Sequence, residues 1–371
     1  MRLTIEKLVY GGSGLARTDE GVVFVPKTAP GDVVEADIVE KKKDYSVARV
    51  NEILEPSADR QEPLCVAGCC HWQHILYEKQ VDYKETIIRE SLTRLGHVEW
   101  NGSINRIIGP ARNYRLRATF HVTAGRFGFM QEKTNVVVPI RECASLVPEL
   151  NEFLRTAHPA GAREVHVVSA PAIAASFVFD DGTIRRQGRA TIHVGKIQYR
   201  IRPETFFQAN RFLLAPFISE VVQQAGPSPG NVLELYSGAG FFSVPLSQIA
   251  TEVIGVEGSR AAVRQARENA RVNERWNLKF FEGQVDATLR SEVKPNMVVL
   301  DPPRAGCGVK AAERITELGC QRIVYVSCNP STFAREAAVF LAHGYDLRRL
   351  TLVDQFPNTY HIETVGLFEL R

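Results

Sequence analysis

The stretch Arg322-Ile-Val-Tyr-Val-Ser-Cys328-Asn-Pro-Ser-Thr332 places one thiol between an apolar run and the start of a helix. The apolar run, bounded by turn residues, predicts a buried strand of a parallel sheet. The Asn-Pro-Ser that follows is typical of a helix N-cap and first turn, so a helix is expected from Thr332 to His343. Because a helix N-terminus stabilises a thiolate, this placement predicts a lowered pKa for Cys328 and a competent nucleophile. The alternative, which this strand alone favours, is that Cys328 is a small buried apolar residue.

The alternation of strand and helix begins after Pro227-Ser-Pro-Gly230, a boundary signal. It predicts a doubly wound parallel sheet of the Rossmann type. The last two apolar runs have no full helix between them and are expected to pair antiparallel at an edge. The expected strands are residues 231–236, 252–257, 278–282, 297–301 and 322–328, followed by the two runs 350–356 and 362–370.

The N-terminal 54 residues alternate short β-type runs with turns such as Gly11-Gly-Ser-Gly14 and Pro30-Gly-Asp32, which predicts a small OB-like β-barrel. Its basic side chains suit a nucleic-acid surface, although a solvated charged face explains them equally well. These are Lys27, Lys41, Lys42, Lys43 and Arg49. A multidomain α/β protein is therefore expected. Its predicted domains are a β-barrel at 1–56, a central α+β domain at 57–202 and the doubly wound domain at 203–371.

The composition of the 371 residues, with 44% apolar and 23% charged side chains, is ordinary for a soluble globular protein. The net charge of +3 allows an RNA or DNA partner without requiring one. No apolar run has the length of a membrane span, and the start has no signal-peptide core. We therefore expect a cytoplasmic protein, a monomer, with no membrane partner.

Four of the seven cysteines form a candidate metal site: Cys65, Cys69 and Cys70 cluster in one loop, and Cys143 stands apart as a fourth ligand. Clustered thiolates are ligands for zinc or for an iron–sulfur cluster, which wants four sulfur ligands. The alternative is a cysteine-rich loop without a metal.

The segment from Val232 to Ser243 reads as a strand, a glycine turn and a helix start. Gly238 and Gly240 let the backbone approach a ligand closely, and Glu257 at the end of the next strand can bind a ribose diol. The pattern fits NAD(P), FAD or S-adenosylmethionine. Because Ser243 replaces the third glycine of the dinucleotide fingerprint, a nucleoside cofactor without phosphates is favoured.

Two more motifs reach the same edge of the predicted sheet. Asp301-Pro-Pro-Arg304 ends the fourth strand, and His361-Ile-Glu363-Thr364 begins the last. Ligands of such sheets sit outside the carboxyl ends of the strands, so Asp301, Cys328 and the glycine turn should converge. A rigid turn and a solvated glutamate are the plainer interpretations. Beside a nucleophilic thiol, however, Glu363 would be a general base.

These motifs, in this order and preceded by Phe207-Gln208, resemble the RNA uracil-5 methyltransferases, and residues 1 to 54 resemble their TRAM barrel. The resemblance implies that Cys328 adds to C6 of a flipped-out uracil, that C5 takes the methyl group of S-adenosylmethionine, and that Glu363 removes the C5 proton. It implies a structured RNA partner, either rRNA, with 23S favoured, or tRNA. By the same resemblance, the contacts to cofactor or uracil come from Gln208, Tyr236, Gly238, Gly240, Glu257 and Asp301.

The resemblance also implies a [4Fe–4S] cluster, since Gln73-His74 follows the third cysteine as in members that hold one. Ala67, however, stands where those members have their second cysteine, and Cys69 adjoins Cys70. Two other functions stay open. An amino-group methyltransferase also uses Asp-Pro-Pro but has no use for Cys328 or Glu363, and a non-catalytic RNA-binding protein needs none of these motifs.

Overall fold

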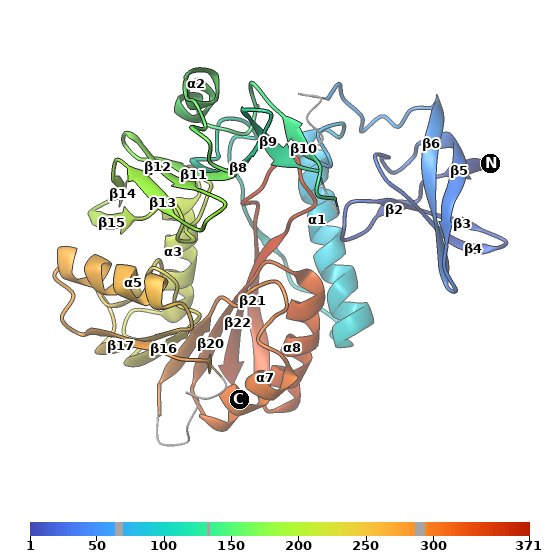
Figure 1. Ribbon diagram of the computed structural model, residues 1–371. Helices are drawn as coiled ribbons and strands as arrows, with labels where there is room; N and C mark the ends of the chain where they lie inside the picture. Colours follow the sequence, from blue (N-terminus) through green and yellow to red (C-terminus); the bar gives the residue numbers. More distant parts are fainter. Residues whose placement is uncertain (64–69, 132–133, 286–293) are drawn as a thin grey trace.

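The computed structural model describes residues 1–63, 70–131, 134–285 and 294–371. Figure 1 shows three parts: the N-terminal barrel to one side, a small central sheet, and a large sheet flanked by helices. None of the helices in the described ranges is long and apolar enough to cross a membrane.

The barrel is a six-stranded sheet in the order β1-β5-β6-β4-β3-β2. Alternate residues of its strands, such as Val23 and Val25 or Val34 and Ala36, are buried in a core of their own. This is the period-2 burial of strands with one solvated face. The strands are β1 (Arg2–Thr4), β2 (Lys7–Leu8), β3 (Gly14–Thr18), β4 (Gly21–Val25), β5 (Val33–Lys41) and β6 (Tyr45–Glu55).

The central sheet is antiparallel, with the order β10-β9-β8-β11-β12-β13, and helix α2 packs against β11 and β12. The hairpin of β14 and β15 packs against α5 of the next part. The elements are β8 (Arg117–Thr123), β9 (Arg126–Met130), β10 (Val137–Pro139), α2 (Pro148–Thr156), β11 (Glu164–Ser169), β12 (Ile173–Val178), β13 (Ile184–Gln187), β14 (Ala190–Val194) and β15 (Ile197–Ile201).

The large sheet confirms the doubly wound fold. Its order is β18-β17-β16-β19-β20-β22-β21-β7, and β16 to β20 are parallel. All of β19 and nearly all of β20 are buried, as expected for central parallel strands covered on both faces. The strands are β16 (Asn231–Leu235), β17 (Glu252–Glu257), β18 (Leu278–Glu282), β19 (Met297–Leu300), β20 (Arg322–Ser327), β21 (Tyr345–Val353) and β22 (Glu363–Leu370). The helices are α3 (Leu214–Ala225), α4 (Ser243–Leu246), α5 (Arg260–Val272), α7 (Val309–Glu317) and α8 (Pro330–Ala342).

The edge of this sheet differs from the prediction. Strands β21 and β22 pair antiparallel as expected, but β7 (Asn105–Ile107) pairs parallel to β21 and occupies the edge instead. The segment before it, α1 (Tyr77–Ser91) and the π-helical turn η1 (Leu92–Gly96), packs on α8. A Cβ on Gly96 would lie 2.5 Å from the Ala334 carbonyl oxygen, so glycine permits this close approach. Residues 77–107 therefore lie on the large sheet, although the sequence predicts them in the central domain.

Candidate active site

The register of the large sheet brings the three candidate catalytic side chains to one edge. In the antiparallel pair β20–β22, Ser327 lies opposite Thr364, so the next residue along each chain in the same direction is Cys328 on one and Glu363 on the other. Asp301 directly follows β19, the other neighbour of β20. The thiol and the two carboxyls therefore meet at the carboxyl end of the sheet.

The main chain around Cys328 is held by its own neighbours. The Asn329 side chain accepts a hydrogen bond from the Ser331 N–H at 3.0 Å and caps α8, whose first residue is Pro330. The hydroxyls of Ser327 and Thr332 donate to the Asn329 carbonyl at 3.1 and 3.0 Å. The predicted helix start immediately after the thiol is thus present.

The predicted low pKa of Cys328 is wrong. Burial, followed by the carboxyls of Glu363 and Asp301, raises the pKa of this thiol to about 12, whereas Arg304 opposes them. The helix N-terminus is outweighed because desolvation penalises the thiolate directly. Without substrate, Cys328 is therefore a thiol at neutral pH.

The two carboxyls also favour their neutral forms. Burial, and then the charge of Asp301, raises the pKa of Glu363 well above its usual value. Burial raises the pKa of Asp301 to about 7. Glu363 is 7% exposed, so little water competes for its proton. Burial thus favours the protonated form of Glu363, whereas Asp301, with a pKa of about 7, is close to its protonation midpoint at neutral pH.

Arg304 is the cation of this edge. Its Nη2 lies 3.4 Å from the ring nitrogens of His361, and its carbonyl accepts a hydrogen bond from the Asn329 amide at 3.0 Å. Burial, together with Arg304, lowers the pKa of His361 to about 3, so this imidazole is neutral. It can accept a hydrogen bond but carries no charge.

The glycine turn after β16 is tied to the acid that ends β17. The Glu257 carboxylate accepts hydrogen bonds from the main-chain N–H groups of Gly238 at 3.0 Å and Ser259 at 2.6 Å. Each oxygen keeps a lone pair for a further donor such as a ribose hydroxyl. Tyr236 has φ +61, a left-handed conformation that non-glycine residues adopt mainly at constrained sites. A Cβ on Gly238 would meet open space. The turn fits a nucleoside ligand at Tyr236, Gly238, Gly240 and Glu257.

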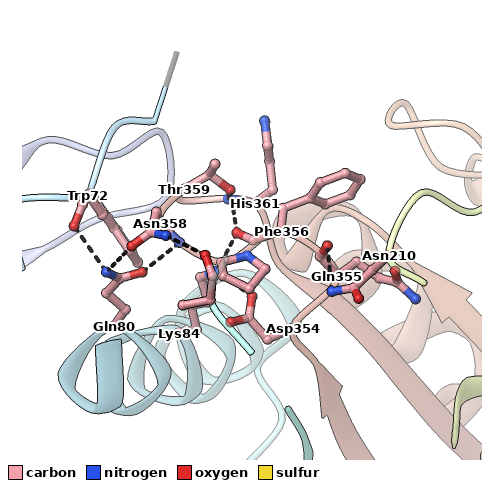
Figure 2. Close-up of polar contacts among 12 residues, drawn as sticks. Trp72, Gln80, Lys84, Asn210, Asp354, Gln355, Phe356, Asn358, Thr359 and His361 are labelled. Carbon is pink, nitrogen blue, oxygen red and sulfur yellow. Dashed lines mark hydrogen bonds and ion pairs between the residues drawn. The ribbon is translucent and has the colours of Figure 1, made fainter. Parts of the chain in front are cut away.

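Gln208 lies in a segment that contacts the loop before Glu363. It is buried in the segment 203–210, where the Arg117 guanidinium donates to three main-chain carbonyls, those of Pro203, Thr205 and Phe207. The Asn210 side chain then donates to the Gln355 carbonyl at 3.3 Å, as Figure 2 shows. This contact links the Gln208 segment to the loop that precedes Glu363.

That loop, residues 354–362, is held by helix α1 (Figure 2). Lys84 forms an ion pair of 2.7 Å with Asp354, both side chains being fully buried, and also donates to the Phe356 carbonyl at 3.2 Å. One turn earlier, Gln80 accepts from the Asn358 N–H at 2.8 Å and donates to the Asn358 side chain at 3.1 Å.

Sequence reasoning missed these contacts, although it held one signal for them. Gln80 and Lys84 are four residues apart, and both share the buried face of α1 with Val81, Ile87 and Ile88. Polar side chains on an apolar helix face need buried partners. The pattern thus asks for partners but does not say where in the chain they lie.

The cysteine cluster is only partly described, because Cys65 and Cys69 lie outside the described residues. The Cys70 sulfur is 3.5 Å from the Ser145 hydroxyl oxygen, and Cys143, two residues before Ser145, is 3% exposed. Cys70 and the turn carrying Cys143 therefore adjoin, as a shared cluster requires. Across the described residues alone, no group of three or more His, Cys, Asp or Glu side chains is arranged to hold a metal ion.

Residues 156–287 and 281–371 match the sequence family described as tRNA (Uracil-5-)-methyltransferase. Residues 1–58 match the TRAM domain of tRNA (uracil(54)-C(5))-methyltransferase.

Individual proteins are similar over the whole chain. An uncharacterized RNA methyltransferase of Aquifex aeolicus (strain VF5) is 33% identical over 100% of this chain and 99% of its own length. A 23S rRNA (uracil(1939)-C(5))-methyltransferase of Shewanella sp. (strain ANA-3) is 29% identical over 99% of this chain and 95% of its own. The fold matches the crystal structure of a Pyrococcus abyssi tRNA (uracil-54, C5)-methyltransferase in complex with S-adenosyl-L-homocysteine, with a TM-score of 0.74, 23% identity, and coverage of 99% and 100% of the two chains.

Proposed function

The chain belongs to the tRNA (uracil-5-)-methyltransferase family, and we propose that it methylates C5 of one uridine in a structured RNA by way of a covalent bond between Cys328 and C6 of the uracil. The observation that carries this proposal is the β20–β22 register, which sets Cys328 beside Glu363 at the sheet edge that Asp301 also reaches. An amino-group methyltransferase would use Asp301 alone, and an RNA-binding protein would need none of the three.

The chemistry requires a nucleophile because C5 of uracil is too weak a carbon nucleophile on its own. Addition of the Cys328 sulfur to C6 saturates the ring and places electron density on C5. S-adenosylmethionine, held at the Gly238 turn and Glu257, supplies an electrophilic methyl group. Glu363 then takes the proton from C5, and the C6–sulfur bond breaks to restore the uracil and the thiolate. A uracil stacked in a helix cannot present C6, so the base must be flipped out or unpaired.

The proposed role of each residue depends on its protonation state. Cys328 must lose its proton before it adds, and Arg304 is the nearby positive charge that lowers its pKa. Glu363 must be ionised before it can take the C5 proton, and Arg304 lowers its pKa in the same way. Asp301, with a pKa of about 7, can donate a hydrogen bond to a uracil carbonyl in its neutral form. We assign Gln208 to the uracil or the cofactor at the same edge.

We propose 23S rRNA as the substrate RNA. The Shewanella relative named for that RNA is similar over 95% of its own length, whereas the tRNA enzyme of Pyrococcus abyssi is a likeness of fold. The barrel supports an RNA partner with the exposed side chains of Lys27, Lys43 and Arg49, although Lys41 and Lys42 are paired with Glu20 and Glu40. Two transcripts, one of the 23S rRNA region equivalent to uracil 1939 and one of tRNA, should be incubated with S-adenosylmethionine and digested for mass spectrometry. 5-Methyluridine in the first transcript is the expected result.

The covalent step is tested by two variants. Cys328→Ala should bind RNA and cofactor but form neither adduct nor 5-methyluridine. Glu363→Gln should carry out addition and methyl transfer and then stall, because removal of a general base slows proton transfer by about 10² to 10⁴-fold. Its protein–RNA adduct should survive denaturing electrophoresis. Loss of turnover in Glu363→Gln without an adduct would show that Glu363 is not the base, and His361 would be tested next.

We also propose that Cys70 and Cys143, with Cys65 and Cys69, hold a [4Fe–4S] cluster. The contact between Cys70 and Ser145 supports it, because it brings Cys70 beside the turn that carries Cys143. Protein purified without oxygen should be brown and contain iron and sulfide, and Cys143→Ser should bleach it. Colourless anaerobic protein would exclude the cluster while leaving the methylation proposal intact.

A further inference from the structure

The turn between β2 and β3 of the barrel reaches the catalytic edge of the large sheet. The Tyr10 hydroxyl donates a hydrogen bond to the carbonyl oxygen of Cys328 at 3.3 Å. The Tyr10 ring meets Tyr360 edge-on, with ring centroids 5.8 Å apart and planes at 90°. Tyr360 is three residues before Glu363, so one barrel residue contacts the chain on both sides of the site.

Gly12 fixes the same turn from the other end. It is buried, and its carbonyl accepts a hydrogen bond from the Trp72 indole N–H at 3.0 Å. Its φ is +92, and a Cβ at this position would lie 2.8 Å from Cδ1 of Tyr360. Gly11, its neighbour, has φ +101 but a Cβ there would meet nothing within 4 Å. Both glycines therefore adopt a positive φ that disfavours a side chain, but only at Gly12 would a side chain also collide with Tyr360.

Trp72 continues this connection to the catalytic loop. Its main-chain N–H donates to the Asn358 carbonyl at 3.0 Å, and its main-chain carbonyl accepts from Gln80, which also holds Asn358. Figure 2 shows Trp72, Gln80 and Asn358 in this arrangement. The ring of His71 lies against Tyr360, with centroids 4.5 Å apart. The barrel turn, the segment 71–72 and the loop 354–362 form one continuous packed unit.

The electrostatics agree with this proximity. Burial raises the pKa of Tyr10 to about 12, and Cys328 and Glu363 contribute to the rise, while Arg304 opposes it. The phenol therefore stays neutral at neutral pH and remains a donor to the Cys328 carbonyl.

We propose that the β2–β3 turn of the barrel is part of the active site, and that Tyr10 is a positioning residue that fixes the main chain of Cys328. This rests on the proposed role of Cys328 as the nucleophile. The turn ties the barrel to the chemistry and not to RNA binding alone. A barrel that has shifted on its RNA would move Tyr10, and with it the peptide from which the thiol projects.

The hydroxyl is tested by Tyr10→Phe, which keeps the ring against Tyr360, and its matched control is Tyr45→Phe, an exposed tyrosine of the same barrel. The probe is the 23S rRNA transcript carrying 5-fluorouridine, because fluorine cannot leave C5 as a proton does and the adduct accumulates. Tyr10→Phe should slow adduct formation about 3- to 10-fold, the effect of one lost hydrogen bond. RNA dissociation constants should stay within about twofold of wild type. Equal adduct rates for Tyr10→Phe and Tyr45→Phe would overturn the assignment of Tyr10.

The contact is tested by Gly12→Ala against Gly11→Ala. Both add the same strain at positive φ, but only Gly12→Ala displaces Tyr360. Gly12→Ala should slow adduct formation on the order of 10²-fold, as expected for a misplacement of about 1 Å. It should also change the rate at which iodoacetamide alkylates the Cys328 thiol, since Tyr360 and the Tyr10 contact with the Cys328 carbonyl are displaced together. If both variants react alike in both assays, the turn is not part of the site.

The two proposals fail separately. If the wild-type chain forms no adduct on the 23S rRNA or tRNA transcript, the covalent mechanism fails. The alkylation assay, which needs no RNA, then still decides whether the turn influences Cys328. If the wild type forms the adduct and Gly12→Ala matches Gly11→Ala, the inference about the barrel fails alone.

Discussion

Two loops meet at the catalytic edge, and they are held in opposite ways. The loop that carries Cys328 is held mainly by residues two or three positions away: the Asn329 side chain accepts a hydrogen bond from the Ser331 N–H, and Thr332 donates back to the Asn329 carbonyl. Its distant contact is Tyr10 of the barrel. The loop that precedes Glu363 is held mainly by residues from 145 to 278 positions away. Lys84 binds Asp354, Gln80 binds Asn358, and the Tyr114 hydroxyl donates to the Pro357 carbonyl at 3.2 Å.

The two loops therefore position different catalytic groups in different ways. The nucleophile is placed first by a strand end and a helix cap, which depend on one short stretch of sequence, and Tyr10 then holds its carbonyl. The base is placed by tertiary structure, so its position depends on α1 and the segments that pack with it. Anything that shifts α1 against the large sheet should therefore disturb proton removal before it disturbs addition of the thiol.

The largest effect is expected at the buried ion pair. Lys84→Met leaves the Asp354 carboxylate buried without its cation, which should lower the free energy of unfolding by about 3–5 kcal/mol in urea titrations. Lys79→Met is the control on the same helix, because Lys79 is exposed and lies 3.7 Å from Asp59. It should cost less than about 1 kcal/mol. Equal losses for the two variants would mean that the distant loop does not depend on this pair.

The pH dependence of Cys328 alkylation tests whether Glu363, which follows the distant loop, raises the pKa of the thiol. With a pKa of about 12, Cys328 is a thiolate less often than an ordinary cysteine, whose pKa is near 9. Its alkylation by iodoacetamide at pH 8, followed by mass spectrometry of the Cys328 peptide, should be about a thousandfold slower than that of a free peptide thiol.

The raised pKa of Cys328 determines how its alkylation rate changes with pH. Because the thiolate fraction rises tenfold per pH unit below the pKa, the rate should climb without a plateau up to about pH 10. Glu363→Gln removes a carboxyl that raises this pKa, so its profile should move to lower pH. A wild-type plateau below pH 9 would contradict the burial of the thiol.

The sequence predicted the local loop and could not predict the distant one. The helix start at Asn329 and Pro330, the parallel strands and the meeting of Asp301 with Cys328 follow from patterns within a few residues or from the general rule for parallel sheets. The edge strand β7 and the partners of Lys84 depend on which distant segments pack together, and no short pattern encodes that.

The prediction of a low pKa for Cys328 was wrong for a related reason. A helix N-terminus is visible in the sequence, but the burial of the thiol and the approach of Glu363 are not. Tyr10 shows the same limit, because the residues around Gly11-Gly-Ser-Gly14 predict a turn and say nothing of what it touches. Glu363 was predicted as a base only because its motif reaches the same sheet edge as a nucleophilic thiol; a lone glutamate at a strand start would be interpreted as solvated.

A smaller effect is expected at the second contact of α1. Gln80→Leu removes the acceptor of the Asn358 N–H and the donor to the Trp72 and Ile75 carbonyls. Buried polar groups left without partners should lower the free energy of unfolding by about 1–3 kcal/mol. Glu78→Leu, an exposed change on the same helix, should stay within about 0.5 kcal/mol. A Gln80→Leu protein as stable as Glu78→Leu would show that the loop holds itself.

The smallest effect is expected at the local loop, where a single residue carries two separable roles. Asn329→Ala loses the cap of α8 and should lower the free energy of unfolding by about 1 kcal/mol. Asn329→Asp restores the acceptor for the Ser331 N–H but not the donor to the Arg304 carbonyl, which the asparagine amide contacts at 3.0 Å. It should therefore regain stability in urea titrations without regaining the rate of adduct formation, because Arg304 is the cation that favours the thiolate.

At the distant loop no such repair is expected, since Lys84→Arg brings a larger, branched cation into a fully buried space. If Asn329→Asp recovers both stability and rate, the cap alone positions the nucleophile and the contact with Arg304 has no part in it.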